Sequence, residues 1–497
     1  MKTTLYLLAI LLLIVPDANA QKSAASDRTA VSITVYNQNL SLIREERTIN
    51  FNQGIGSIIV PDIPSTIDGT SLHFQSITNP AGVRVLEQNY AYDLVNQGKL
   101  LDRYIGKEVE FIRTDPESKK EYTVKGRLLA SGLASAGGGF PGFEAASQGV
   151  VAEINGKIEL NPVGRLVLPS LPDGLILKPQ LEWLVSATNG GKHNAEISYL
   201  AGGLSWTSDY VALMDKNGST IDLTGWVTLT NNSGTSFRDA ALKLVAGDVN
   251  VVRQQFNEGM MGKAMRMDMA AAEPQFKQTD LFEYKLYSLQ RKTNLDNNQT
   301  KQIELITGTD VPSKKLLVYD GLDNQWRYWL NNYDYRGQGT FGQQSNPKVG
   351  VYIVFRNDEK SHLGMPLPKG RIRLYQRDDD GKEQFIGEDQ IDHTPKDEEL
   401  RLYVGNAFDV IGERAQADFK TIASGKVVEE TIRIKLRNHK KEAVDVVVYE
   451  HPWRWNQWEI IHKTDDYEKV DQATIKFPVR VGKDEEKTIT YTIRYSW

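Results

Sequence analysis

Short runs in which apolar and polar residues alternate recur along most of the chain, and this period of two constrains the fold more than any other feature. Alternation of this kind places successive side chains on opposite faces of a β-strand. Clusters of Gly, Asp and Asn, which favour turns, separate the runs. We therefore predict a mainly β, multi-domain protein of antiparallel β-sandwich, Ig-like domains. The clearest runs place on one face Val31, Ile33 and Val35; Ile432, Ile434 and Leu436; Ile475, Phe477, Val479 and Val481; and Ile489, Tyr491, Ile493 and Tyr495.

One segment departs from this pattern. In residues 90–106, YAYDLVNQGKLLDRYIG, the side chains of Leu94, Leu101, Tyr104 and Ile105 fall close to helical spacing. We predict one short helix there.

Turn-rich segments divide the chain into three parts. Residues 30–88 are predicted to form a small N-terminal β-domain. Residues 89–185 are predicted to hold the helix and a small β-barrel or β-sheet. Residues 190–497 are predicted to form a β-sandwich domain that a disordered insert interrupts at 256–278.

The first twenty residues have the features of a secretory signal peptide. A lysine at position 2 precedes an apolar run at 5–15, and Ala18-Asn19-Ala20 matches an A-x-A cleavage site. The run is shorter than the roughly 18 residues that a membrane-spanning helix needs. We therefore expect residues 1–20 to be removed, no transmembrane segment to remain, and the protein to be exported to the periplasm or the extracellular space.

Composition excludes several classes of function. The chain of 497 residues contains no cysteine, which rules out disulfides, thiolate metal sites and cysteine nucleophiles. Its formal net charge is −5, with basic and acidic residues interspersed, so we expect no nucleic-acid partner.

Two motifs match binding signatures only formally. GGGFPG at 137–142 fits G-x-G-x-x-G, but Pro141 interrupts it and no helix follows, so we interpret it as a loop. In QRDDDGKEQFIGE, Gly381 aligns with the sixth position of a calcium loop, but Gln376 and Gly387 occupy its two anchor positions. A hairpin turn fits this segment better.

We predict no catalytic residue, no cofactor and no metal. The sequence contains no G-x-S-x-G, H-E-x-x-H or P-loop motif. The seven histidines lack ligand spacing, and a zinc site would need the strands to bring His439, His451 and His462 together. A loose calcium site at Glu388 or Asp389 is the other alternative.

Two aromatic clusters, NQWRYWLNNYDYRGQGTF and HPWRWNQWEI, supply the candidate binding surface. Exposed aromatic rings offer rigid, amphipathic contact area, suited for example to stacking on sugars. The alternative is that these rings close the ends of the sandwich cores. The candidate residues are Trp326, Tyr328, Trp329, Trp453, Trp455 and Trp458.

A methionine-rich segment, EGMMGKAMRMDMAAAEP, holds five of the eight methionines within 260–269. Thioethers suit Cu(I), and a helix would align Met261, Met265 and Met269. The remaining residues are mostly small or charged, which favours a disordered insert. Copper binding is the alternative, and a membrane-surface helix would need bulkier apolar residues.

Four segments, at 199–215, 225–250, 369–410 and 432–451, resemble in order and spacing domain-of-unknown-function family 4139, whose relatives include the mucoidy-inhibitor-like proteins. The resemblance extends over residues 195–497. It implies an exported β-sandwich protein with a low-complexity insert and no established catalytic residue. One short helix and a small β-region replace the long coiled coil of many relatives.

Within the resembling region, Asp389, Asp392 and His393 mark a candidate polar turn. Asp392 can accept a hydrogen bond from a neighbouring backbone N–H, and Pro395 fixes the chain direction. This turn chemistry favours a structural role over a catalytic one.

We therefore expect an exported, non-enzymatic β-protein of the cell envelope that is a binding or assembly module for a protein or glycan partner. The alternative is an envelope-polymer hydrolase, which needs Glu388, Asp389, Asp392 and His393 to converge in a deep pocket. A further alternative is an outer-membrane-associated β-protein, because the last strand alternates and ends in Trp497.

Overall fold

The computed structural model confirms a mainly β protein, with 64% of residues in strands and 5% in helices. The described residues are 21–22, 27–91, 93–131, 149–172, 174–247, 249–250, 275–330, 337–339, 345–423 and 425–497. The predicted signal peptide at 1–20, the GGGFPG loop and the methionines at 260–269 lie outside these residues. The predicted insert at 256–278 lies outside them as far as residue 274, and a strand begins at Phe276.

Two sheets form the N-terminal part of the molecule. The smaller sheet has the order β1 (Gln21–Lys22), β4 (Gly54–Pro61), β12 (Gln180–Ala187) and β6 (Val83–Ala91). The larger has the order β17 (Phe276–Leu281), β18 (Tyr284–Leu289), β16 (Phe237–Ala246), β2 (Arg28–Tyr36), β3 (Leu40–Phe51), β13 (Gly191–Ala201) and β5 (His73–Ser76), with β19 (Thr293–Leu295) paired to β16.

A single hydrophobic core joins these two sheets, and it includes Ile33, Trp183, Phe237 and Ile303. Residues 30–88 therefore share a core with strands that come much later in the chain. β12 pairs with β4 and β6, and β13 pairs with β3 along its whole length. This arrangement differs from the predicted division at 88 and 190, because period-two patterns do not reveal which distant strands pair.

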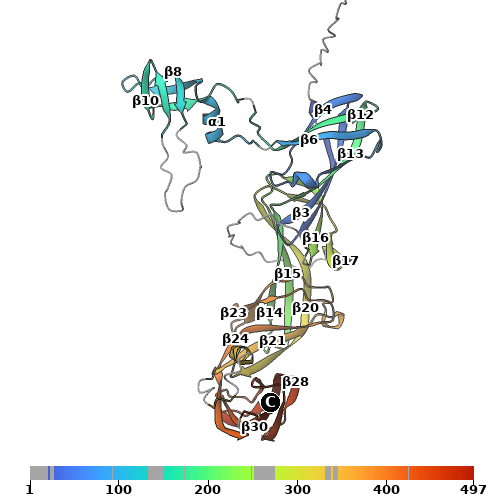
Figure 1. Ribbon diagram of the computed structural model, residues 1–497, viewed down its shortest axis with the longest axis vertical. Coiled ribbons are helices and arrows are strands. Elements are labelled where there is room, and N and C mark those ends of the chain that lie inside the picture. The colour runs from blue at the N-terminus through green and yellow to red at the C-terminus, as the bar shows by residue number, and fades with distance from the viewer. Residues whose placement is uncertain are drawn as a thin grey trace, which may run out of the picture.

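The predicted helix and small β-region form a separate unit with its own core. Helix α1 (Gln97–Tyr104) begins later than the pattern indicated, because Asn96 caps it by accepting a hydrogen bond from the backbone N–H of Lys99. In Figure 1 the unit is set to one side of the elongated remainder. Its sheet has the order β10 (Lys157–Leu160), β9 (Val151–Ile154), β8 (Glu121–Ala130), β7 (Glu108–Thr114) and β11 (Arg165–Val167).

The largest sheet occupies the C-terminal half of the chain. β26 (Val444–Glu450) pairs with β20 and β29 (Thr474–Val481), and β28 (Glu468–Asp471) pairs with β29. The main strand order is β23 (Glu383–Ile391), β22 (Gly370–Arg377), β14 (Leu204–Met214), β15 (Thr220–Asn231), β20 (Gln299–Asp320), β21 (Lys348–Arg356), β24 (Glu399–Ala423), β25 (Val427–Asn438), β30 (Glu485–Ser496) and β27 (Trp458–Lys463).

Two long strands, β20 and β24, connect the successive cores of this half (Figure 1). The first part of β20 pairs with β15, and its last part pairs with β21 and β26. β24 likewise pairs first with β21 and then with β25. The sandwich predicted over 190–497 therefore contains two cores of its own, one around Ile372 and one around Ile434, and it also contributes to the N-terminal core.

Every apolar face predicted from alternation is buried, including those of Ile33, Ile434 and Ile493. The C-terminal core also buries two ion pairs, Arg414 with Glu450 and Arg454 with Glu430. Burial opposes ionisation of Glu430, but Arg454, Arg414 and Gln416 together outweigh it and lower the pKa of this carboxyl.

Three short helices complete the described structure: η2 (Gly69–Ser71), α2 (Gln325–Leu330) and η4 (Glu359–Ser361). Helix α2 was not predicted, and it holds part of the first aromatic cluster. In the part of the chain that the structure describes, no helix has both the length and the apolar character that crossing a bilayer requires.

Candidate functional site

A hollow of about 640 Å³ lies on the outer face of the largest sheet, where β26, β20, β21 and β24 run side by side. We call it the tyrosine pocket. Its volume falls within the range of small-ligand sites. It is lined by Val318, Asp320, Asp323, Asn324, Asn346, Lys348, Gly350, Tyr352, Arg401, Tyr403, Asn406, Tyr449 and His451.

Strand alternation explains why these side chains gather on one face. Tyr319, Val349 and Leu402 point into the cores, so the residues next to them in sequence point outward. The register then brings outward residues together across the strands, with Tyr352 opposite Tyr403.

Gly350 provides the hollow at the centre of this face. A Cβ atom there would stand 3.0 Å from Cε2 of Tyr352 and 3.5 Å from Cε2 of Tyr403. The two tyrosine rings lie 5.3 Å apart with their planes inclined at 54°. Any larger residue at 350 would press against Tyr352 and take up the space beside both rings.

Both tyrosines keep polar ends for hydrogen bonding. The hydroxyl of Tyr403 donates to Oδ1 of Asn406 at 3.0 Å. Burial, and then Tyr403, raise the pKa of Tyr352, so its hydroxyl stays protonated and able to donate. The pocket therefore offers aromatic rings next to hydrogen-bonding groups.

Asp320 connects the pocket wall to the loop that follows β20. Its Oδ1 accepts hydrogen bonds from the backbone N–H groups of Leu322 and Asp323. Its Oδ2 lies 3.1 Å from Nε2 of His451. The ring of Trp326 stacks on His451, with centroids 4.4 Å apart and planes inclined by only 9°. The loop and helix α2 are therefore held against the end of β26.

The polar lining consists mainly of groups that bind without covalent chemistry. Asn324, Asn346 and Asn406 each provide an amide that can donate and accept. Among the described lining residues there is no serine, threonine or cysteine to serve as a nucleophile. The arrangement fits recognition of a ligand with many hydroxyl groups and an apolar ring face.

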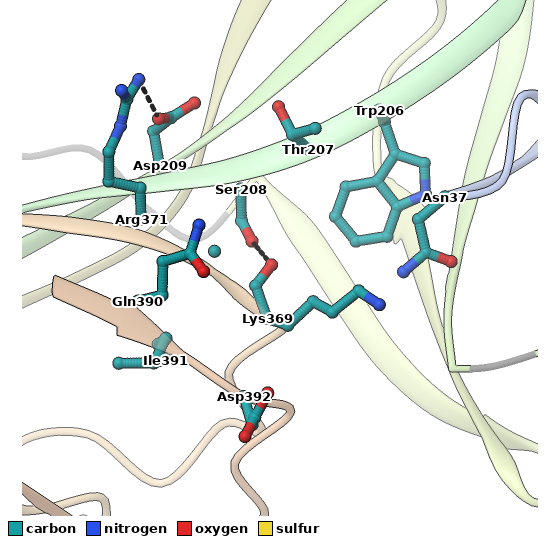
Figure 2. Close-up of a pocket in the computed structure, with 11 residues that line it drawn as sticks. Asn37, Trp206, Thr207, Ser208, Asp209, Lys369, Arg371, Gln390, Ile391 and Asp392 are labelled. Atoms are coloured by element: carbon teal, nitrogen blue, oxygen red, sulfur yellow. Dashed lines mark hydrogen bonds and ion pairs between the residues drawn. The ribbon is translucent and has the colours of Figure 1, made fainter.

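A second hollow, of about 600 Å³, lies where β14, β22 and β23 meet the turn after β2 (Figure 2). Ser208 donates from Oγ to the carbonyl of Lys369 at 2.7 Å, and Arg371 pairs with Asp209 at 3.2 Å. Gly370 is required there because a Cβ atom would stand 2.1 Å from the carbonyl oxygen of Ser208. Ser208 and Arg371 are thus engaged within the hollow, whereas the buried Oδ1 of Asn37 and Nε1 of Trp206 have no hydrogen-bond partner among the described residues.

The predicted polar turn is divided between different roles. Asp392 lines the second hollow (Figure 2). Asp389 instead accepts the backbone N–H of Tyr403 at 2.7 Å, and Nδ1 of His393 accepts the backbone N–H of Lys369 at 3.1 Å. Glu388 lies 3.5 Å from Arg373. Of the four residues Glu388, Asp389, Asp392 and His393, only Asp392 lines either of the two hollows.

The predicted aromatic surface is also divided. Trp326 supports the wall of the tyrosine pocket through His451, whereas Tyr328 is 87% exposed. Trp329 lies 5.1 Å from Trp453, which is buried. Trp455 and Trp458 pack against the C-terminal core, where Nε1 of Trp458 donates to the carbonyl of Gln472 at 2.8 Å.

The segment QRDDDGKEQFIGE forms the predicted hairpin turn between β22 and β23. Gly381 has φ of +75°, and Asp378 accepts hydrogen bonds from the backbone N–H groups of Asp380 and Lys382. Within the described residues, no group of three or more histidine, aspartate or glutamate side chains is placed to hold a metal ion.

Sequence reasoning missed most of the tyrosine pocket. A detectable signal was present in KVGVYIVF, where Lys348, Gly350 and Tyr352 occupy the outward positions of a strand. Glycine inside a strand often marks a place where a ligand or another backbone approaches closely. The partners Tyr403 and Tyr449 could not be assigned to the same site without the strand order.

A scan against protein-family models finds no match to this chain, and a search of curated proteins finds no match either. Function therefore has to be argued from the geometry of the site.

Proposed function

We propose that the protein is an exported, non-enzymatic binding module of the cell envelope that holds a glycan in the tyrosine pocket. The pair Tyr352–Tyr403 beside Gly350 is the observation that carries this proposal. The signal-like residues 1–20 and the resemblance to family 4139 support export, and the β-sandwich architecture accords with both.

The physical argument rests on the two-sided character of a sugar ring. Its C–H face is apolar and can lie on an aromatic ring, while its hydroxyl groups need donors and acceptors around the edge. The tyrosine pocket supplies both, because the rings of Tyr352 and Tyr403 lie together and the hydroxyl of Tyr403 contacts the amide of Asn406. A pocket lined by apolar side chains alone would not satisfy the hydroxyl groups.

The hydrolase alternative receives less support from the same geometry. In the tyrosine pocket Asp320 is engaged by His451 and by two backbone N–H groups. Glycoside hydrolysis uses a pair of carboxyl groups, and with Asp320 engaged, Asp323 is the one carboxylate left among the described residues that line the pocket. Holding the pocket wall in place is a structural use of the Asp320 carboxylate.

Co-sedimentation with insoluble envelope glycan tests the proposal. We expect the mature protein and a Tyr328→Ala variant to sediment with the glycan, and a Tyr403→Ala variant to remain mostly in the supernatant. Tyr328 is the matched control because it is exposed and does not line the pocket. Capture of an envelope protein with no glycan, or sedimentation unaffected by Tyr403→Ala, would contradict the proposal.

A further inference from the structure

The charges of the tyrosine pocket are not equally available to a ligand. The carboxylate of Asp320 is the least available of them, because it pairs with His451 and accepts hydrogen bonds from two backbone N–H groups. Asp323 also lines the pocket, and Lys348 and Arg401 supply the two strand-borne cations. The available charges are thus two cations and one carboxylate.

Neither cation is tightly paired: Arg401 has one long ion pair, and Lys348 has none among the described residues. The nearest described carboxylate to Arg401 is that of Glu399, at 3.9 Å, and both side chains are about half exposed. Lys348 forms no ion pair with any residue in the described parts of the chain. Elsewhere on the same sheet, by contrast, Arg371 pairs with Asp209 and Lys216 with Asp379.

The two cations lie at opposite ends of the tyrosine pair. Along β21 the outward residues run Lys348, Gly350 and Tyr352, and Arg401 lies opposite Val354 at the far end. Position 354 lies six positions beyond position 348 along β21, which corresponds to roughly 20 Å between the two backbone sites at the rise of a β-strand. The backbone positions of the two cations are therefore farther apart than one sugar ring is wide.

From these positions we infer that the ligand of the tyrosine pocket is an anionic glycan polymer, with carboxylate or phosphate groups on more than one sugar. This inference rests on the proposed function and narrows its ligand to one chemical class. One sugar ring lies on Tyr352 and Tyr403, and acidic groups further along the polymer reach Lys348 at one end and Arg401 at the other. Guanidinium and ammonium groups both form charge-assisted hydrogen bonds with such anions.

Affinity measurements with a matched set of polymers test the inference. The probes are a polyuronate, the same polyuronate with its carboxylates methyl-esterified, a phosphorylated dextran and unmodified dextran. We expect one or both acidic polymers to bind at least about tenfold more tightly than the uncharged ones at low salt. Which acidic polymer binds more tightly identifies carboxylate or phosphate as the recognised group.

A double variant, Lys348→Met with Arg401→Gln, is expected to lose this preference but keep residual binding to the uncharged polymers. The control is Lys216→Met with Arg377→Gln, which removes the same charge outside the pocket. Wild-type affinity for the acidic polymer should also fall as salt is raised.

The outcomes separate the two proposals. Equal wild-type affinity for charged and esterified polymers, with dependence on Tyr403 retained, would overturn the inference and leave glycan binding standing. Binding of none of the four polymers, together with no sedimentation on envelope glycan, would overturn both. If salt did not weaken the affinity of the wild-type protein for the acidic polymer, the inference would also be contradicted. This measurement does not depend on whether the variants fold.

Discussion

The ring of Tyr352 lies 5.3 Å from the ring of Tyr403, and both rings border the space that a side chain at Gly350 would fill. Gly350 and Tyr352 lie on β21 and Tyr403 lies on β24, and these two strands are neighbours in the sheet. The three residues together create a concave aromatic surface on an otherwise ordinary sheet face, and the proposed binding function depends on that shape.

Filling the hollow should weaken binding while the protein stays folded. We expect Gly350→Val to weaken glycan affinity by at least about tenfold, because its methyl groups would occupy the space beside Tyr352. A β-branched residue suits a strand, so the thermal midpoint should not fall by more than a few degrees. Gly56→Val is the control, since nothing lies within 4 Å of a Cβ at that strand position. Full affinity in Gly350→Val would show that the ligand binds elsewhere.

Removing the carboxylate of Asp320 should loosen the pocket wall. Asp320→Ala takes the hydrogen-bond acceptor from the backbone N–H groups of Leu322 and Asp323 and the partner from His451. We expect faster amide hydrogen exchange at Leu322 and Asp323, and altered fluorescence of Trp326, with the strand amides of β21 unaffected. Asp323→Ala is the comparison, because Asp323 contributes only its backbone N–H to this set of bonds. Unchanged exchange in Asp320→Ala would refute the role given to Asp320.

The buried carboxyl of Glu430 should make stability depend on acid pH. Its pKa is lowered in the folded protein, because Arg454, Arg414 and Gln416 outweigh the opposing effect of burial. A carboxyl of this kind contributes stability above its unfolded pKa, near 4.5, and that contribution is lost as pH falls through the lower folded pKa. Chemical denaturation between pH 7 and pH 2 measures this slope.

Glu430→Gln should both destabilise the protein and flatten this pH dependence. The variant leaves the buried guanidinium of Arg454 without its counter-charge, which costs about 3–5 kcal/mol at neutral pH. Asp379→Asn, at an exposed pair with Lys216, should leave the unfolding free energy nearly unchanged. Equal acid slopes in wild type and Glu430→Gln would contradict this account of the C-terminal core.

A buried asparagine at the end of β15 should be essential to the fold. Nδ2 of Asn231 donates to the carbonyls of Thr235 and Leu295, and its Oδ1 accepts the backbone N–H of Ser233. Asn231→Ala leaves these buried groups without partners, so we expect a loss of about 3 kcal/mol in unfolding free energy. The adjacent Asn232 is exposed, and Asn232→Ala should change the free energy by less than about 0.5 kcal/mol. Similar losses in the two variants would refute this assignment.

Local features of the fold could be predicted because they depend on neighbouring residues. Alternation placed Ile33 and Ile434 in cores, and Gly381, with φ of +75°, occupies the hairpin turn predicted in QRDDDGKEQFIGE. Long-range pairing could not be predicted in this way. Nothing in the pattern of residues 180–187 indicates that β12 lies between β4 and β6. Strands with the same alternation of apolar and polar residues could pair in several orders, and tertiary contacts select one of them.

The candidate site shows the same limit. Aromatic residues close together in sequence, such as Trp326 and Tyr328, were easy to identify, but the structure gives them unlike roles. The tyrosine pocket instead combines Tyr352 with Tyr403 and Tyr449, which lie far apart in the chain. They come together because β26, β20, β21 and β24 are neighbours in the sheet. The sequence alone does not reveal this strand order.

Isothermal titration calorimetry tests the central claim most directly. The wild-type protein and variants of the tyrosine pair are titrated with the polyuronate or the phosphorylated dextran, whichever binds more tightly. The account predicts saturable binding by the wild-type protein. Tyr352→Ala with Tyr403→Ala should weaken that affinity by at least about tenfold, whereas Tyr328→Ala should keep it. Wild-type affinity in a folded double variant would contradict the assignment of the binding site to this pocket.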